Sequence, residues 1–280
     1  MKTSALNSWL KSIRIGHLVG LTVATLAIRH SFYHQLAFHG VLNEILFILP
    51  IIFVSAGGNI INDYFDIKED RLKRPSKSVI GRTLKRRVAM MTQWVFTALA
   101  IAISILLASK YDTYLPIIIT TMASALLFLY SVWLKKRILL GNVVVASIAT
   151  SFIVLALCDV DINKLGDKYD WLCCLVFTTV MIRQITKDID DHEIDKDANR
   201  RTLPVAIGIN KSWLLIYAFE AFLINLTYYA INYNSNTTFT AFLCSIVAIT
   251  IFYSVRKKTQ AVSAWVRLII FTGIAWLVLF

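Results

Sequence analysis

Nine long apolar runs, separated by short polar segments, limit the folds that this chain can adopt. An α-helix needs about 20 apolar residues to cross a hydrocarbon core of about 30 Å, and the runs are of roughly that length. They therefore predict about nine membrane-spanning helices. The predicted spans are residues 15–32, 41–64, 88–109, 114–134, 139–157, 171–185, 212–231, 237–255 and 261–280.

The composition supports a membrane protein. Apolar residues make up 57% of the chain and charged residues 16%, whereas soluble domains have roughly 45–50% and about 25%. No low-complexity segment or soluble domain interrupts the apolar runs. We therefore predict an all-α integral membrane protein that forms a single domain over residues 1–280.

Basic residues are distributed unevenly between alternate loops. The far-side loops carry only Lys110, Lys164 and Lys168, and the basic residues of the other side lie within residues 2–14, 68–87, 135–137, 183–211 and 256–258. Because cytoplasmic loops are enriched in lysine and arginine, we predict a cytoplasmic N-terminus and a C-terminus on the far side. This dispersal explains the net charge of +12 without nucleic acid as a partner.

The second apolar run ends in an acidic stretch whose oxygen-bearing side chains, Asn62, Asp66 and Asp70, recur every four residues. Residues four apart lie on one face of a helix, so like charges there repel unless a cation lies between them. Hard oxygen ligands suit Mg²⁺, which commonly shares its coordination shell with water and substrate phosphates. Acidic residues at the mouth of a membrane helix are costly and are therefore candidates for function.

Another acidic stretch follows the sixth run and repeats this arrangement as a weak internal echo. Asp188, Asp191 and Asp195 precede a basic loop at residues 200–204, as the first stretch precedes Arg74. Two pseudo-repeated four-helix units, plus one helix, would bring the acidic clusters together across one cavity. The competing interpretation is a pair of solvated loops, since charge runs are usually solvated; matching positions on the same side disfavour it.

Together the two clusters predict a diphosphate site. They could hold more than one Mg²⁺, and nearby basic residues would neutralise the remaining phosphate charge. The basic candidates are Arg74, Lys77, Lys135 and Lys187. The favoured reaction is ionisation of an allylic prenyl diphosphate, whose leaving group is stabilised as charge develops on it. Ionisation leaves an allylic carbocation, which a nucleophile on another substrate captures. Burial in a membrane bundle keeps water away from this carbocation.

At these residues the chain resembles the UbiA superfamily of intramembrane prenyltransferases. One signature of that family is similar to Asn-Asp-x-x-Asp-x-x-x-Asp and is matched by Asn62, Asp63, Asp66 and Asp70. Its other signature is similar to Lys-Asp-x-x-Asp-x-x-x-Asp, followed by a basic loop and Thr-Leu-Pro. That signature is matched by Lys187, Asp188, Asp191, Asp195 and residues 202–204.

Further elements extend the resemblance over essentially the whole chain. They are Tyr130, Ser131, Leu134 and Lys135 for a Tyr-Ser-x-x-Leu-Lys element, Gly141-Asn142 after it, Arg14 at the start of the first helix, and Arg183 before the signature that begins at Lys187. The resemblance implies nine helices around a central cavity, Mg²⁺ as cofactor, and prenyl transfer.

The predicted site divides into metal ligands and substrate contacts. The predicted ligands of Mg²⁺ are Asn62, Asp66, Asp70, Asp188, Asp191 and Asp195, with Asp66, Asp70, Asp191 and Asp195 also assigned to catalysis. The predicted contacts to diphosphate or acceptor are Arg14, Asn62, Arg74, Lys77, Tyr130, Ser131, Lys135, Arg183 and Lys187.

The two signatures are most similar to those of the branch that holds digeranylgeranylglyceryl phosphate synthase and chlorophyll synthase. The resemblance therefore favours a prenylglycerol phosphate as the lipid acceptor, with an aromatic quinone or haem precursor as the alternative. A cation-coupled transporter is the competing class, because transporters also combine internal repeats with intramembrane acids. Transporter acids lie near the bilayer midplane, whereas these lie at the ends of spans. The expected location is a prokaryotic inner (plasma) membrane.

Overall fold

The structure, a computed structural model, describes residues 5–32, 40–67, 71, 79–161, 165–233 and 237–279, and most of these residues are helical. Within these residues there is no β-strand, only an isolated bridge between Ile80 and Leu84. Each predicted span is occupied by a helix. These helices are α2 (Ile15–Phe32), α3 (Val41–Phe65), α5 (Arg86–Tyr111), α6 (Leu115–Val132), α7 (Leu140–Ala156), α8 (Gly166–Asp190), α11 (Ile209–Tyr233), α12 (Thr237–Val255) and α13 (Thr259–Leu279).

Four shorter elements lie between or before these helices: α1 (Ala5–Ile13), the 3-10 turn η1 (Leu134–Lys136), α9 (His192–Asp197) and α10 (Leu203–Ile207). By length and composition, four of the described helices can cross a membrane: α3, α5, α6 and the Ile209–Ile231 part of α11. The all-helical membrane fold is thus confirmed, and the count of nine spans stays a prediction.

The chain divides into two compact units. The first contains Met1–Arg29, Tyr33–Val132 and Val154–Val160, and the second contains His30–Phe32, Trp133–Ile153 and Asp161–Phe280. One boundary falls between α6 and η1 and another near the end of α7, so α7 contributes to both units. The single domain and the four-helix repeat remain predictions.

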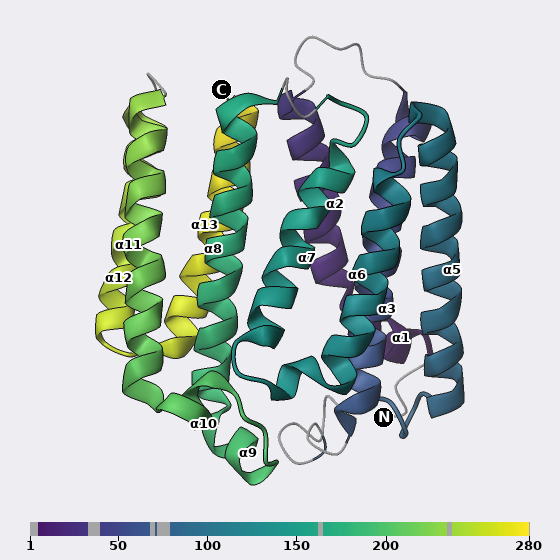
Figure 1. Cartoon of the computed structure of the whole chain (residues 1–280), viewed down its shortest axis with the longest axis horizontal. Coiled ribbons are helices and arrows are strands. Elements are labelled where there is room, and N and C mark those ends of the chain that lie inside the picture. The colour runs from purple at the N-terminus through teal and green to yellow at the C-terminus, as the bar shows by residue number, and fades with distance from the viewer. Residues whose placement is uncertain are drawn as a thin grey trace. The chain divides into compact units, whose positions relative to one another are not determined.

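In the first unit α3 is the central helix. It packs against α5 and α6, which also pack against each other. The short helix α1 packs against the C-terminal part of α3 (Figure 1). Gly58 permits a close approach to α6, because a Cβ at this position would lie 2.7 Å from Cδ1 of Leu127. Near the acidic end of α3, Trp9 and Ile13 of α1 pack against a buried apolar cluster that includes Ile60.

A buried ion cluster ties three segments of the first unit together. Arg29, in the last turn of α2, is 2% exposed; its Nε lies 2.6 Å from Oε2 of Glu44 on α3. Its NH1 donates to Oδ1 of Asp159 over 3.2 Å and to the carbonyl of Ala156 over 2.7 Å. The guanidinium also stacks over the Phe47 ring, 3.6 Å from the centroid. An unpaired charge in a membrane bundle is costly. The ion pairs therefore hold α2, α3 and the segment after α7 together.

In the second unit α8 is the central helix. It packs against α11 and α13, and α12 packs against both of these (Figure 1). Trp171 anchors the start of α8 by donating from Nε1 to the carbonyl of Leu226 on α11 over 2.8 Å. Gly273 on α13 allows close packing, because a Cβ there would clash with Leu175.

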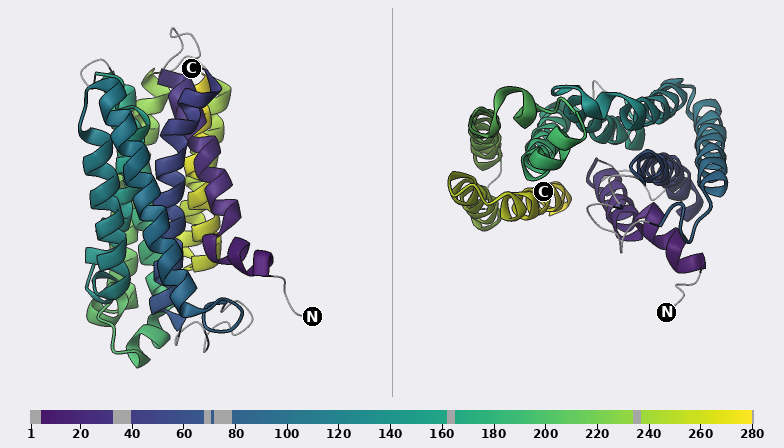
Figure 2. Two further views of the ribbon diagram at one scale, coloured as in Figure 1. Left: turned by 90° about the vertical axis from the view of Figure 1, so that its right-hand side faces the viewer. Right: turned by 90° about the horizontal axis from the view of Figure 1, so that it is seen from below.

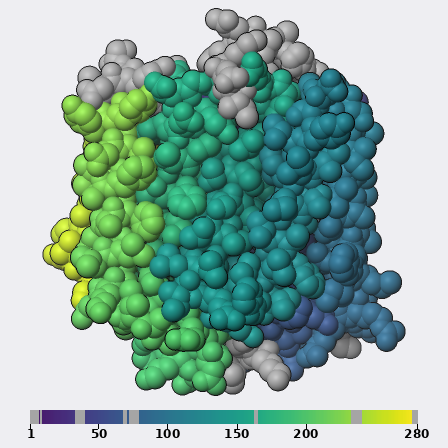
Figure 3. All heavy atoms as spheres, in the orientation of Figure 1, coloured from purple at the N-terminus to yellow at the C-terminus, as the bar shows by residue number. Residues whose placement is uncertain are grey.

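The outward faces of several helices are apolar, as a bilayer requires. On α5, Met91, Trp94 and Leu106 are all more than half exposed, and the helix lies open along its length at the edge of the surface in Figure 3. On α11, Leu214 and Ile224 are similarly exposed. Large apolar side chains in such numbers mark a surface that contacts lipid, so the chain is an integral membrane protein.

The predicted spans left residues 159–170 and 186–210 as polar loops, but both segments are partly helical. The polar loop expected at residues 159–170 ends early, because α8 begins at Gly166. The loop expected at residues 186–210 is largely helical, because α8 continues to Asp190 and is followed by α9 and α10. The prediction was wrong because charge was taken as a sign of loop, although no glycine or proline interrupts residues 186–198.

Candidate active site

The first acidic motif lies where α3 ends. Asn62 is in the last turn, and Asp66 caps the helix, with its N–H donating to the carbonyl of Asn62 over 3.0 Å. Both side chains are half-buried and one helical turn apart, so they share a face. Asp70, the third member, lies outside the described residues, as do Arg74 and Lys77.

Arg14 lies beside this motif. It separates α1 from α2 and has a left-handed backbone conformation with φ of 56°. The helix α1 points away from the N-terminal end of α2 (Figure 2). Its NH2 donates to Oδ1 of Asp63 over 2.8 Å. Another bond runs from Nδ2 of Asn59 to the carbonyl of Ile13, over 3.1 Å. The helix junction is thereby fixed to the end of α3.

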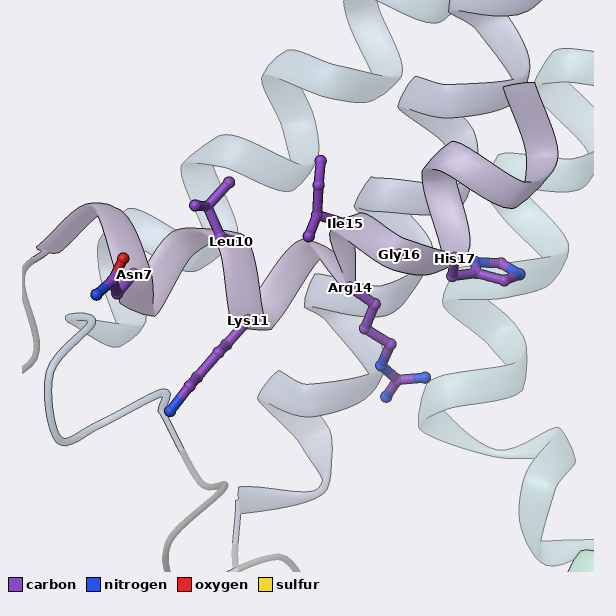
Figure 4. Close-up of a pocket in the computed structure, with 7 residues that line it drawn as sticks. All are labelled: Asn7, Leu10, Lys11, Arg14, Ile15, Gly16 and His17. Carbon is purple, nitrogen blue, oxygen red and sulfur yellow. The ribbon is translucent and has the colours of Figure 1, made fainter. Parts of the chain in front are cut away.

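A groove of about 450 Å³ lies at the same junction. In Figure 4 the side chains of Lys11 and Arg14 extend to one side of the chain, and those of Leu10 and Ile15 to the other. Helices with this separation of basic and apolar side chains lie along membrane surfaces. The groove thus has basic side chains on one side of the chain and apolar side chains on the other.

The second acidic motif lies where α8 ends and α9 begins. Asp188 is in the last turn of α8, and Asp191 joins the two helices. The N–H of Asp191 donates to the carbonyl of Lys187 over 3.0 Å, and that of Asp195 to the carbonyl of Asp191 over 2.9 Å. The helical path therefore continues through the motif and keeps Asp191 and Asp195 one turn apart.

Asp188 is held by a neutral partner from another helix. Nδ2 of Asn142, in the first turn of α7, donates to its Oδ2 over 2.8 Å. Burial raises the pKa of Asp188 to about 6, while the hydrogen bond from Asn142 and the charge of Lys187 act in the opposite direction. This group lies beyond the predicted span of residues 171–185.

Asp195 is instead held by a cation. It is 3% exposed, and NH1 of Arg200 donates to its Oδ1 over 3.3 Å. The Arg200 N–H also donates to the Asp195 carbonyl over 2.8 Å, and the N–H of Arg201 donates to the carbonyl of Lys136 over 3.1 Å. These bonds join the basic loop after α9 both to the acidic motif and to the connection between α6 and α7.

The remaining predicted contacts occupy α6, η1 and α8. Ser131 is buried, and its hydroxyl donates to the carbonyl of Leu127 over 2.9 Å. Tyr130 precedes it and is half-buried, as is Lys135 in η1. On α8, Arg183 is half-buried and Lys187 is exposed one turn later. Tyr130, Ser131 and the first motif belong to the first unit; Lys135, Arg183 and the second motif belong to the second.

The donor atoms of both motifs are oxygens, which suit Mg²⁺ rather than a softer metal. Within residues that the structure describes, no three His, Cys, Asp or Glu side chains form a compact metal-binding group. Mg²⁺ needs only one or two carboxylates when substrate phosphates and water complete its shell. Asn142, the hydrogen-bond partner of Asp188, is neutral and brings no positive charge that would compete with a metal ion, so the residues present fit the ion.

Two residues that orient the acidic motif were not among the predicted site residues. Asn142 appeared only as part of a sequence element, and Arg200 as part of a basic loop. A polar amide in the first turn of an otherwise apolar helix is a usable indication, because a buried amide needs a partner. An arginine five residues after an acid gives no such indication.

A comparison with family models matches residues 18–278 to the UbiA prenyltransferase family. A similar relative is the digeranylgeranylglyceryl phosphate synthase of Methanoregula boonei, 29% identical over 180 residues, which are 64% of this chain and 62% of the relative. The enzyme of the same name from Thermococcus sibiricus is 30% identical over 198 residues, which are 71% of this chain and 66% of that one. The alignment thus spans just under two thirds of these relatives.

Solved structures share the fold over nearly the whole chain. One, from a study of digeranylgeranylglyceryl phosphate synthase in membranes, has a TM-score of 0.76 at 20% identity and covers 99% of this chain and 98% of that one. Another, a UbiA homologue from Archaeoglobus fulgidus bound to GPP and Mg²⁺, has a TM-score of 0.67 at 17% identity. It covers 96% of this chain and 99% of that one.

Proposed function

The chain belongs to the UbiA prenyltransferase family, and on that premise we propose that it transfers a prenyl chain from an allylic prenyl diphosphate to a lipid acceptor. The favoured acceptor is a prenylglycerol phosphate, which would make the product an ether lipid. The names of the similar relatives support this acceptor. An aromatic acceptor remains the alternative, and no feature of the described residues favours it.

One observation carries the proposal: each acidic motif lies at the end of a long helix rather than in its middle. Asn62 and Asp66 end α3, and Asp188 and Asp191 end α8. A diphosphate head group needs such a polar helix end, while its isoprenoid tail needs the apolar interior that follows. Acids that couple a cation to transport lie near the midplane instead, so this placement favours the transferase over the transporter.

In this proposal the two motifs share one diphosphate. Bound Mg²⁺ would neutralise the diphosphate as negative charge develops on it. The residues that would hold the Mg²⁺ ions are Asn62, Asp66, Asp70, Asp188, Asp191 and Asp195. The cationic side chains of Arg14, Arg74, Lys77, Lys135, Arg183 and Lys187 bind phosphate oxygens, and Tyr130 and Ser131 line the site.

The transfer itself is a substitution at the allylic carbon. The carbon–oxygen bond to diphosphate breaks, the hydroxyl oxygen of the acceptor forms the new bond, and the hydroxyl proton is released. The chain contributes by binding both substrates, by aligning the hydroxyl with the allylic carbon, and by excluding water from the cation.

We further propose one domain, located in a prokaryotic inner membrane, with the N-terminus and motif-bearing loops in the cytoplasm.

Incubation of the purified protein with labelled geranylgeranyl diphosphate, Mg²⁺ and a panel of acceptors tests the proposal. The expected product has the mass of the prenylglycerol phosphate plus one prenyl group. Product formation should stop on addition of EDTA and resume on addition of excess Mg²⁺. Turnover with an aromatic acceptor alone would reject the prenylglycerol phosphate as acceptor in favour of an aromatic one. No turnover with any acceptor would reject the reaction itself.

A further inference from the structure

Asn142 makes a contact that connects α7 to the second acidic motif. Its Nδ2 donates to Oδ2 of Asp188 over 2.8 Å, from the first turn of one helix to the last turn of another, 46 residues away. Asn142 is only 7% exposed. A buried carboxamide is costly without a partner, so this pairing is part of how the second unit packs.

An amide can orient a carboxylate without removing its charge. Because asparagine is neutral, its hydrogen bond fixes one oxygen of Asp188 and leaves the negative charge for a cation. Asp195 differs, because the Arg200 guanidinium 3.3 Å away balances its charge. The two carboxylates are thus held in different ways, Asp195 by a cation and Asp188 by a neutral donor.

The segment that carries Asn142 is itself anchored beside the motif. The carbonyl of Lys136 accepts the N–H of Arg201 over 3.1 Å. Leu139 then adopts φ of 59°, a left-handed conformation that leucine rarely takes, and directs the chain into α7. Lys135, a proposed diphosphate contact, lies on this same segment. One short connection therefore presents both the lysine and the amide.

We propose that Asn142 is a positioning residue that orients Asp188 so that its other oxygen is presented to the Mg²⁺ of the prenyl diphosphate complex. The inference rests on the proposed function. Groups that orient metal ligands typically contribute roughly 10- to 100-fold in metal affinity or activity. Loss of this amide should therefore weaken metal binding and leave the fold in place.

The test compares Asn142→Leu, which removes the donor at similar size, with Thr150→Val as a matched control. Thr150 lies further along α7, and its hydroxyl bonds only to the carbonyl of Ala146 among the contacts that the structure describes. Mn²⁺ is titrated into the purified full-length protein with unreactive geranyl S-thiolodiphosphate, and bound ion is measured by electron paramagnetic resonance. Thermal unfolding and steady-state kinetics are measured on the same preparations.

Asn142→Leu is expected to raise the Kd for Mn²⁺ roughly 10- to 100-fold and to lower kcat, with the KM for the acceptor and the unfolding temperature near those of the control. Unchanged Mn²⁺ affinity in the folded variant overturns the proposal, whatever happens to activity. If Asn142→Leu does not fold, Asn142→Ser is used instead, because its hydroxyl is too short to reach Asp188, and the same outcomes decide.

Failure of the proposed function would give a different result. Wild-type protein that binds Mn²⁺ with the diphosphate analogue but transfers no prenyl group rejects the reaction, while the effect of Asn142→Leu on Mn²⁺ binding still decides the positioning role. Wild-type protein that binds no Mn²⁺ in the presence of the analogue rejects both.

Discussion

Replacement of Arg29 by methionine should destabilise the protein far more than replacement of Arg14, although each arginine lies close to one end of α2. Arg29 and its partners are buried: the side chains of Arg29 and Asp159 are 2% and 3% exposed, and that of Glu44 is 13% exposed. Arg29→Met leaves two carboxylates facing each other without a cation. The side chain of Arg14, by contrast, is 49% exposed and its partner is Asp63.

The magnitude follows from this difference in burial. Breaking a buried ion pair by removing one partner costs about 3–5 kcal/mol, and the carbonyl of Ala156 also loses its side-chain donor, at 2.7 Å. We therefore expect Arg29→Met to lower the free energy of unfolding by about 4 kcal/mol. Arg14→Met should lower it by about 0–1 kcal/mol, as for exposed pairs. Arg29→Lys should fall between, because an ammonium cannot reproduce the forked geometry.

The assay is equilibrium unfolding by SDS titration in mixed micelles, followed by circular dichroism. A triple variant that adds Glu44→Gln and Asp159→Asn to Arg29→Met should recover a large part of the loss, because no unpaired charge remains. The reasoning would be refuted if Arg29→Met stayed within about 1 kcal/mol of wild type, the ceiling for an exposed pair. Lack of recovery in the triple variant would assign the loss to packing instead of charge.

Three further predictions concern the site and its orientation. Single-cysteine labelling of intact vesicles should find residues 68–87 and 187–211 on the same side; opposite sides would end the shared-site proposal. Asp66→Ala and Asp191→Ala should each lower kcat by at least roughly a thousandfold, as expected when about 4 kcal/mol of metal-derived stabilisation is lost, while circular dichroism shows a folded protein; near-normal turnover would remove that residue from the site. Lys136→Ala should raise the KM for an anionic lipid acceptor several-fold with that for the prenyl diphosphate unchanged; the reverse split would favour a neutral aromatic acceptor.

The positions of the helices could be predicted from the sequence because they depend on local properties. A run of about 20 apolar residues specifies a spanning helix wherever it occurs, and all nine predicted runs contain a helix in the described part of the chain. The family could likewise be predicted from the spacing of the two acidic signatures, which needs no tertiary information. The exact end of α8 could not be predicted from the sequence. The same acidic residues suit a solvated loop and a helical turn, and tertiary packing selects between the two.

The tertiary structure decided which polar groups meet. Arg14 pairs with Asp63, 49 residues away, and Asn142 with Asp188, 46 residues away. Arg29 pairs with Asp159 across 130 residues. The sequence shows that an arginine in an apolar run needs a partner, because an unpaired charge there is costly, but several acids satisfy that requirement equally. Only the packing of α2, α3 and the end of α7 brings Glu44 and Asp159 within reach of one guanidinium.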